Sequence, residues 1–413
     1  MLRVAALIPA VAALLAGPAA ATPPAAKNTC VDCHGDLLEE AGQDVHRAAG
    51  LACVDCHRGD PKAEDPEKSK SPARGFVGRP KGWAAAEMCG RCHADIERMR
   101  VINPRLPTDQ LAQYRTSEHG KLALQGSLRV ATCASCHGFH GIKPVADPGS
   151  PASKGRIVET CTGCHNPEYM KGAKLPTDQL ERYTRSVHGK KRLAERDPSA
   201  PACSDCHGNH GAAPPGVYAV THVCGKCHVT QAELFGASSH ATYFREGQMP
   251  PCTTCHDHHE ILPTSDEMLG TGPRGVCAAC HQPGDRCDQA TTAMKTGLGS
   301  LALASERARA ALARAERLGM DVERPTYDLS GAGEALVRAR VVVHTFSADE
   351  FGKVIAEGQE IAAEVDKQAQ AKLQEYRYRR QGLVVASVLL LLFAGLLALK
   401  ARRLDEERRR DGC

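Results

Sequence analysis

The sequence is poor in aromatic residues: phenylalanine, tryptophan and tyrosine together make up 4% of its 413 residues. Aromatic side chains normally contribute a large share of the buried area of a protein core. A chain of this length is long enough for two or three domains, so each domain needs a core. The composition therefore excludes an interior built mainly from aromatic side chains, and something else must fill it.

Long apolar stretches are also few, and they lie near the two ends of the sequence. The first follows a single arginine, Arg3, and ends at a small-residue cleavage site, so residues 1–21 are predicted to be a secretory signal peptide. Residues 382–399 carry no charge, and we expect a transmembrane helix over residues 382–400, with a buried core helix as the alternative.

Charge does not decide the orientation of this helix, because arginines flank both of its ends almost equally. The signal peptide does decide it. We expect a single-pass protein of the cytoplasmic membrane of a bacterium, with its bulk in the periplasm and residues 401–413 in the cytoplasm.

Cysteine and histidine, in contrast, are abundant, with 20 and 19 residues. Eighteen of the cysteines form nine C-x-x-C-H motifs. Two cysteines at this spacing can form thioethers with the two vinyl groups of one haem, and the next histidine can bind its iron. A single C-x-x-C could be half of a zinc site or a redox dithiol. Nine copies, each followed by histidine in an exported chain, predict nine covalently bound haem c groups.

The predicted haem-binding residues follow directly from the nine motifs. The attachment cysteines are Cys30, Cys33, Cys53, Cys56, Cys89, Cys92, Cys133, Cys136, Cys161, Cys164, Cys203, Cys206, Cys224, Cys227, Cys252, Cys255, Cys277 and Cys280. The proximal iron ligands are His34, His57, His93, His137, His165, His207, His228, His256 and His281. No catalytic residue is predicted.

The segments between motifs are rich in proline and glycine, as in GAAPPGV at residues 211–217. Such segments cannot build a core of side chains, so the porphyrins must form the core. We therefore expect a mainly α protein with short helices on the motifs, long irregular loops, almost no strand and an unfolded apo-domain. Residues 22–283 are the predicted nine-haem cytochrome c domain.

Ten histidines remain outside the motifs, and seven of them recur at fixed offsets from a motif. Four precede a motif, three of them in S-x-H, and three stand three residues after a motif histidine. Recurrence at a haem site predicts that these seven are distal iron ligands: His46, His119, His188, His240, His140, His210 and His259. Asp60 takes the equivalent place after the second motif, so that neighbourhood needs a ligand from elsewhere.

Three further histidines are candidates for about two remaining irons. We predict His344 and His222 as ligands ahead of His258. His344 also has the spacing of a core histidine on a helix. Methionine is the other donor type, and Met88 and Met249 stand near motifs.

Residues 106–121, LPTDQLAQYRTSEHGK, are almost repeated at residues 175–190, LPTDQLERYTRSVHGK. We interpret each copy as a ligand arm. It should be a short helix that begins near Pro107 or Pro176 and ends at Gly120 or Gly189, just after the histidine.

The formal net charge is +4, and the haem propionates should make the loaded protein acidic. Lysines and arginines are therefore interpreted as propionate partners and not as a nucleic-acid surface. Lys121 and Lys190 are candidates for that pairing, with solvated side chains as the alternative.

After residue 283 the composition changes to alanine, glutamate, arginine and leucine, which favours helix. We expect a helical hairpin or stalk over residues 284–381. One helix should include residues 302–319, residues 324–333 should break it, and a second helix should run from residue 334 into the membrane span.

With nine C-x-x-C-H motifs, paired motifs separated by S-x-H-G, and CHGNHGAAPP at residues 206–215, the chain resembles the exported multihaem cytochromes c with doubled CxxCH motifs. The resemblance implies bis-histidine haems and electron relay between membrane quinol oxidation and periplasmic or extracellular acceptors. It also implies partners: a quinol-oxidising membrane subunit such as a cytochrome b, and other periplasmic cytochromes.

Two functions remain at this stage. The first is an electron-transfer protein, favoured because ten spare histidines can close nine sites. The alternative is a multihaem oxidoreductase in which one open haem acts on a small nitrogen or sulfur oxyanion. No C-x-x-C-K motif, typical of the pentahaem nitrite reductases, is present.

Overall fold

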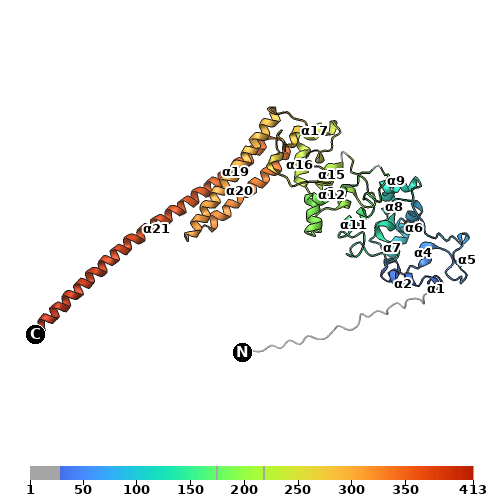
Figure 1. Cartoon of the computed structure of the whole chain (residues 1–413), viewed down its shortest axis with the longest axis horizontal. Helices are drawn as coiled ribbons and strands as arrows, with labels where there is room; N and C mark the ends of the chain where they lie inside the picture. Colours follow the sequence, from blue (N-terminus) through green and yellow to red (C-terminus); the bar gives the residue numbers. More distant parts are fainter. Residues whose placement is uncertain (1–27, 174, 217–218, 413) are drawn as a thin grey trace, which may run out of the picture. The chain divides into compact units, whose positions relative to one another are not determined.

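The computed structural model describes residues 28–173, 175–216 and 219–412, so the predicted signal peptide lies outside the described residues. Helices and irregular loops make up this part of the chain, and it contains no strand (Figure 1). The predicted fold class is confirmed. The chain divides into two compact units, Met1–Thr177 with Pro201–Ala213, and Asp178–Ala200 with Pro214–Cys413.

Short helices joined by loops form the first unit. They are α1 (Cys30–Cys33), α2 (Asp36–Glu40), η1 (Ala41–Gln43), α3 (Val45–Ala48), α4 (Cys53–His57), α5 (Pro66–Ser69), η2 (Pro72–Arg74), α6 (Trp83–His93), α7 (Ile96–Ile102), α8 (Gln110–Thr116), α9 (Glu118–Leu124), α10 (Cys133–His137), α11 (Ile157–Thr162) and α14 (Cys203–His207). All six motifs of this unit overlap one of these helices, as expected.

The side-chain core of the first unit is small. Its cluster of buried residues is Ala86, Tyr114 and Ala123, and Trp83 and Leu111 pack against it. The rings of Trp83 and Tyr114 are stacked with centroids 6.1 Å apart. Such a cluster is too small to hold this unit together by itself, in agreement with an interior that side chains do not supply.

The second unit has short helices followed by three long ones. The short helices are α12 (Gln179–Arg185), α13 (Val187–Gly189), η3 (Lys190–Ala194), α15 (Val220–Gly225), α16 (Val229–Ala237), α17 (Ser239–Glu246), α18 (Thr253–His256), η5 (Asp266–Met268), η6 (Val276–Ala279) and η7 (Val343–Thr345). The long ones are α19 (Arg286–Arg317), α20 (Glu323–Val342) and α21 (Ala348–Asp411).

The three long helices pack as a bundle with a continuous apolar core, and Figure 1 shows α19, α20 and the first part of α21 side by side. Leu298, Leu301 and Val365 are among its fully buried side chains. Gly358 brings α21 close to both partners, since an added Cβ would lie 2.7 Å from Leu301 and 2.8 Å from Ala335.

The prediction that residues 324–333 break the helix is wrong. These residues lie inside α20. Pro325 stands in the first turn of α20, where its missing N–H is not needed. The real break precedes it, because Gly319 has a φ of 77° and ends α19 in the left-handed region.

The end of α21 contains the predicted membrane segment. This helix is long and apolar enough to cross a membrane, and the apolar window is not buried by any other described part of the chain. The unburied state disfavours the alternative of a core helix.

Candidate haem-binding sites

Histidine pairs are the main feature of both units. In the contacts that the structure describes, seven motif histidines each face a second histidine, with ring centroids 5.9 to 6.2 Å apart. The pairs, motif histidine first, are His57–His140, His93–His46, His137–His210, His165–His119, His228–His188, His256–His344 and His281–His240.

This separation fits a haem iron between two imidazoles. A metal–nitrogen bond is about 2 Å long, and two such bonds place the ring centres about 6 Å apart. Two rings in direct stacking contact would lie closer. The donor set and its spacing therefore fit the haem c groups that the motifs predict.

A hollow of about 660 Å³ adjoins the third motif, lined by Val77, Pro80, Ala84, Met88, Leu111 and neighbouring residues. Its lining is mostly apolar, with Glu87 and Arg91 as the charged members, and this suits a porphyrin face. Met88 lies there as a wall residue, while the imidazole of His46 faces the motif histidine, His93.

Most of these imidazoles lie in surroundings that favour their neutral form. Burial, and in most cases a neighbouring histidine, lowers the pKa of eight of them: His93, His119, His137, His165, His188, His210, His240 and His256. Because only the neutral imidazole has a free lone pair for iron, this environment keeps the rings ready to bind.

The pairs follow one register along the chain. Each arm histidine lies between two consecutive motifs and faces the histidine of the motif that follows those two along the chain. For example, His119 lies between the third and fourth motifs and faces His165 of the fifth. Two of the histidines that stand three residues after a motif each face an earlier motif histidine. His140 follows the fourth motif and faces His57 of the second, and His210 follows the sixth and faces His137 of the fourth.

One backbone hydrogen bond recurs wherever an arm meets the loop after a motif. The N–H of the residue before the arm histidine donates to the carbonyl of the fifth residue after a motif histidine. The three examples are Val45 to Ile142 (2.9 Å), Glu118 to Ala212 (3.1 Å) and Val187 to Ile261 (2.8 Å). This bond holds the ligands of two different sites together.

The loops that receive these bonds leave their motifs through the left-handed region. The residue after the motif histidine is Gly138 with φ 84°, Gly208 with φ 79° and Asp257 with φ 64°. Glycine and aspartate adopt this conformation more readily than other residues. The turn sets the course of the chain that carries the histidine two residues farther on.

The twin segments differ from the single helix predicted for each. They form two helices, α8 and α9 in one copy and α12 and α13 in the other, with extended backbone at Ser117 or Ser186 between them. The serine hydroxyl accepts a hydrogen bond from the N–H of Gly120 or Gly189 at 2.9 Å. The histidine therefore stands in the first turn of the second helix.

Gly120 lies inside α9 and does not end it, contrary to the prediction, whereas Gly189 is the last residue of α13 and η3 follows it directly. Both glycines allow the two helices of each arm to meet closely. A Cβ at Gly120 would lie 1.8 Å from the carbonyl oxygen of Tyr114, and one at Gly189 equally close to that of Tyr183. Only glycine fits this backbone contact.

Asp44 replaces the serine in the arm of His46, and the sequence analysis missed it. Its buried carboxylate accepts hydrogen bonds from the N–H groups of His46, Gly141 and Ile142 at 2.8 to 2.9 Å. It also lies 3.0 Å from Nδ1 of His46. A carboxylate there fixes the imidazole and leaves Nε2 for the metal. The sequence DVH in place of S-x-H was the available signal.

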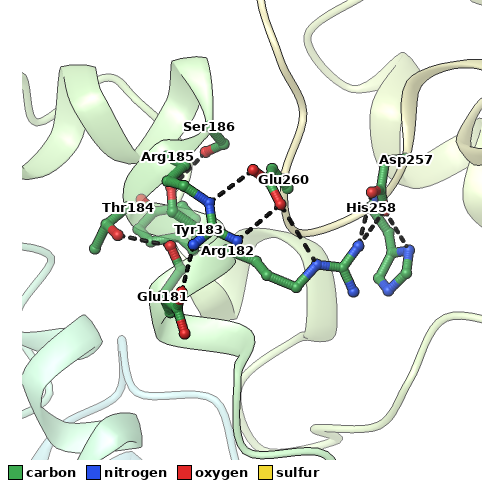
Figure 2. Close-up of polar contacts among 9 residues, drawn as sticks. All are labelled: Glu181, Arg182, Tyr183, Thr184, Arg185, Ser186, Asp257, His258 and Glu260. Carbon is green, nitrogen blue, oxygen red and sulfur yellow. Dashed lines mark hydrogen bonds and ion pairs between the residues drawn. The ribbon is translucent and has the colours of Figure 1, made fainter.

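Ion pairs hold the arm of His188 against the loop after the eighth motif (Figure 2). Arg182 donates to both carboxylate oxygens of Asp257 at 2.7 and 2.8 Å. Arg185 binds Glu260 with two bonds of 2.7 and 2.9 Å. Its guanidinium lowers the pKa of Glu260. Both arginines come from α12, so this helix is fixed at two points.

His344 lies opposite His256, with ring centroids 6.2 Å apart. It stands in η7, the turn between α20 and α21, and its Nδ1 hydrogen-bonds the carbonyl of Val341 at 2.9 Å. Phe346 follows with a φ of 53°, and its ring stacks on His240 at 3.8 Å. The turn between α20 and α21 thus supplies one ligand and supports another.

The cysteines show the order of the sites. In the first unit the neighbouring pairs are Cys30–Cys53, Cys56–Cys92, Cys89–Cys133, Cys136–Cys164 and Cys161–Cys203, and in the second they are Cys224–Cys252 and Cys255 with Cys277 and Cys280. From the second to the fifth motif, each has one cysteine beside the preceding motif and the other beside the following one. Within each unit the sites follow one another in sequence order.

Two of the remaining candidate ligands, His222 and His258, are not brought to a motif histidine in the described contacts. His222 is exposed on α15. His258 pairs with Asp257 at 2.8 Å and contacts the neighbouring ring of His259. Lys121, which was a candidate partner for a haem propionate, pairs with Glu118 at 2.6 Å.

Known proteins share the motifs of this chain. The family model described as Cytochrome c3 matches residues 45–166, and the model described as the doubled CXXCH motif matches residues 242–286. The C-type polyheme cytochrome OmcC of Geobacter sulfurreducens is 23% identical over 229 residues, which are 54% of this chain and 24% of that protein. The chain thus matches about a quarter of this relative's length. No solved structure matches the chain.

Proposed function

Because the chain belongs to the multihaem c-type cytochromes with doubled CXXCH motifs, we propose that it is a membrane-anchored electron relay with nine haem c groups. It takes electrons from a quinol-oxidising membrane partner such as a cytochrome b. It passes them to other periplasmic cytochromes or to extracellular acceptors. This proposal adds the donor, the direction and the number of haems to the family assignment.

The sequence order of the sites is the observation that carries the proposal. Neighbouring cysteines connect the first six motifs in one unit and the last three in the other. A series of this kind suits the passage of electrons along the chain, whereas a single reaction centre needs no such series.

Bound haem supplies one-electron oxidation and reduction at iron. The residues of the chain hold the rings that surround it. The histidine pairs offer nitrogen on both faces, so little rearrangement accompanies a change of charge. The arm bonds of Val45, Glu118 and Val187 fix the ligand positions.

The end of α21 suits a membrane anchor, not a site for haem or proton transfer within the membrane. Residues 382–399 contain neither histidine to bind a membrane haem nor a charge to move protons. The partner subunit must therefore oxidise the quinol. With the signal peptide of residues 1–21, this segment leaves the haem domain in the periplasm and the C-terminus in the cytoplasm.

The test is reduction of the protein in its native membrane. We expect an added quinol to reduce its haems in isolated membranes, and a quinol-oxidising subunit to co-purify after mild solubilisation. The same protein purified without that subunit should remain oxidised when quinol is added. Rapid reduction of the purified chain alone would contradict the need for a partner.

A multihaem oxidoreductase acting on a small nitrogen or sulfur oxyanion is the second candidate. It requires an iron with one open face. His34 is the observation that favours it, because no histidine ring in the described part of the chain faces this motif histidine.

A further inference from the structure

His34 differs from the seven paired motif histidines. Its side chain is exposed, and its backbone makes the ordinary bonds of a short helix, from its N–H to the Cys30 carbonyl at 3.0 Å and from Leu37 to its own carbonyl at 3.2 Å. Within the residues that the structure describes, no second imidazole lies opposite it.

The register of the pairs explains this difference. The third, fifth, seventh and ninth motifs are served by arm histidines that precede them, namely His46, His119, His188 and His240. Before the first motif, residues 1–29 contain no histidine. Among the odd-numbered sites, the first is therefore the one without a preceding arm histidine in this sequence.

Three histidines that lie after motifs are engaged at other sites. His140 and His210 face the second and fourth motifs, and His344 faces the eighth. The second motif has Asp60 at the position in register with His140. The Asp60 carboxylate pairs with Arg74 and accepts a hydrogen bond from the N–H of Lys62 at 3.0 Å. This aspartate is committed to its own loop.

Other polar groups beside the first motif are also engaged. Asn28 accepts from the Cys30 N–H at 3.2 Å, and the Thr29 hydroxyl donates to the Ala63 carbonyl at 2.8 Å. Lys70 and Asp32 are the ionic side chains that act on Cys30.

We propose that the haem held by Cys30, Cys33 and His34 keeps one axial face open and binds a small external ligand there. The ligand class is a small lone-pair donor such as imidazole or cyanide. At this one site, an open face takes the place of the second histidine that was expected at every iron. The relay function does not depend on it, since an open haem can still exchange electrons.

The experiment uses the full-length haem-loaded protein in its oxidised form. Electron paramagnetic resonance should show a high-spin signal equal to one haem per chain. Titration with imidazole or cyanide should convert that one haem to low spin and leave the others unchanged. A fully low-spin spectrum of the untreated protein overturns the proposal.

Two variants assign the signal to its site. C30S/C33S should contain one haem fewer by mass and lose the high-spin signal. H140A opens the site of His57 and should double that signal, which calibrates it. A signal that persists in C30S/C33S would locate the open haem elsewhere and overturn the assignment. If C30S/C33S does not fold, the same decision rests on H34M, because a methionine ligand would shift the signal only if it arises at this site.

Discussion

Single residues fix the geometry of each ligand arm. Ser117 and Gly120 in one copy, and Ser186 and Gly189 in the other, form the same cap and the same close backbone contact. Their side chains never reach the iron, yet they set the place where the imidazole stands.

The first prediction concerns Gly120. In G120A the new Cβ would overlap the Tyr114 carbonyl oxygen, so α8 and α9 must separate at a cost of about 3 kcal/mol. We expect His119 to leave the iron of the fifth site, which a new high-spin signal would reveal. G236A is the matched control, because an added Cβ at Gly236 meets nothing within 4 Å. Equal spectra for the two variants would exclude this role of Gly120.

The second prediction concerns the charge of Asp44. A carboxylate beside Nδ1 makes the imidazole of His46 more basic, which stabilises the oxidised iron. D44N keeps the shape and removes the charge, so one haem should show a higher reduction potential in a potentiometric titration. The control variant is D60N, because it also removes a carboxylate, but one that pairs with Arg74. The explanation fails if D60N shifts a haem as much as D44N does.

At the scale of elements, the turn between α20 and α21 acts as the last member of the ligand series. His240 would be expected to meet a loop after a further motif, and the chain has none beyond Cys277. Phe346 packs on its ring instead, and His344 serves His256. The turn between two long helices thus supplies the contact and the ligand that the loop after a motif supplies at other sites.

The third prediction tests this support. F346A removes the ring that stacks on His240, a contact of about 1 kcal/mol. Cyanide should then replace His240 more readily at the ninth site, which a ligand titration followed by visible absorption would measure. Y327A removes an exposed ring of α20 and should behave as the wild type does. Unchanged cyanide binding in F346A would show that the stack is dispensable.

At the scale of the whole molecule, the stabilising material differs between the haem domain and the long helices. The bundle of α19, α20 and α21 buries many leucine, valine, alanine and methionine side chains. The first unit buries only a small cluster. Side-chain burial can therefore stabilise the bundle without haem, but it cannot stabilise the first unit.

The fourth prediction follows for the full chain produced without haem attachment. Circular dichroism should retain the signal of the long helices and lose that of the short ones. Limited proteolysis should cut residues 28–280 and spare residues 286–381. Protection of both regions would contradict the view that haem forms the core of the first unit.

The sequence predicted the motifs and the mainly helical fold, and it marked seven histidines outside the motifs as candidate distal ligands. All of these depend on local spacing. Six of those seven, together with His344, lie opposite motif histidines. It could not predict which histidine meets which motif, because that pairing joins residues far apart in sequence. It also misjudged Gly120 and residues 324–333, where close packing and the position of Pro325 outweigh the ordinary preference of glycine and proline to end a helix.

If the chain is exported from its N-terminus, as proposed above, the interleaved register sets the order in which its haem sites can be completed. The third, fifth, seventh and ninth sites have both histidines outside as soon as their own motif emerges, because the arm comes first. The second and fourth must wait for two more motifs, until His140 and His210 appear. The eighth must wait for His344, beyond most of the helical hairpin. Among the sites whose histidine pairs are described, the eighth would therefore be completed last.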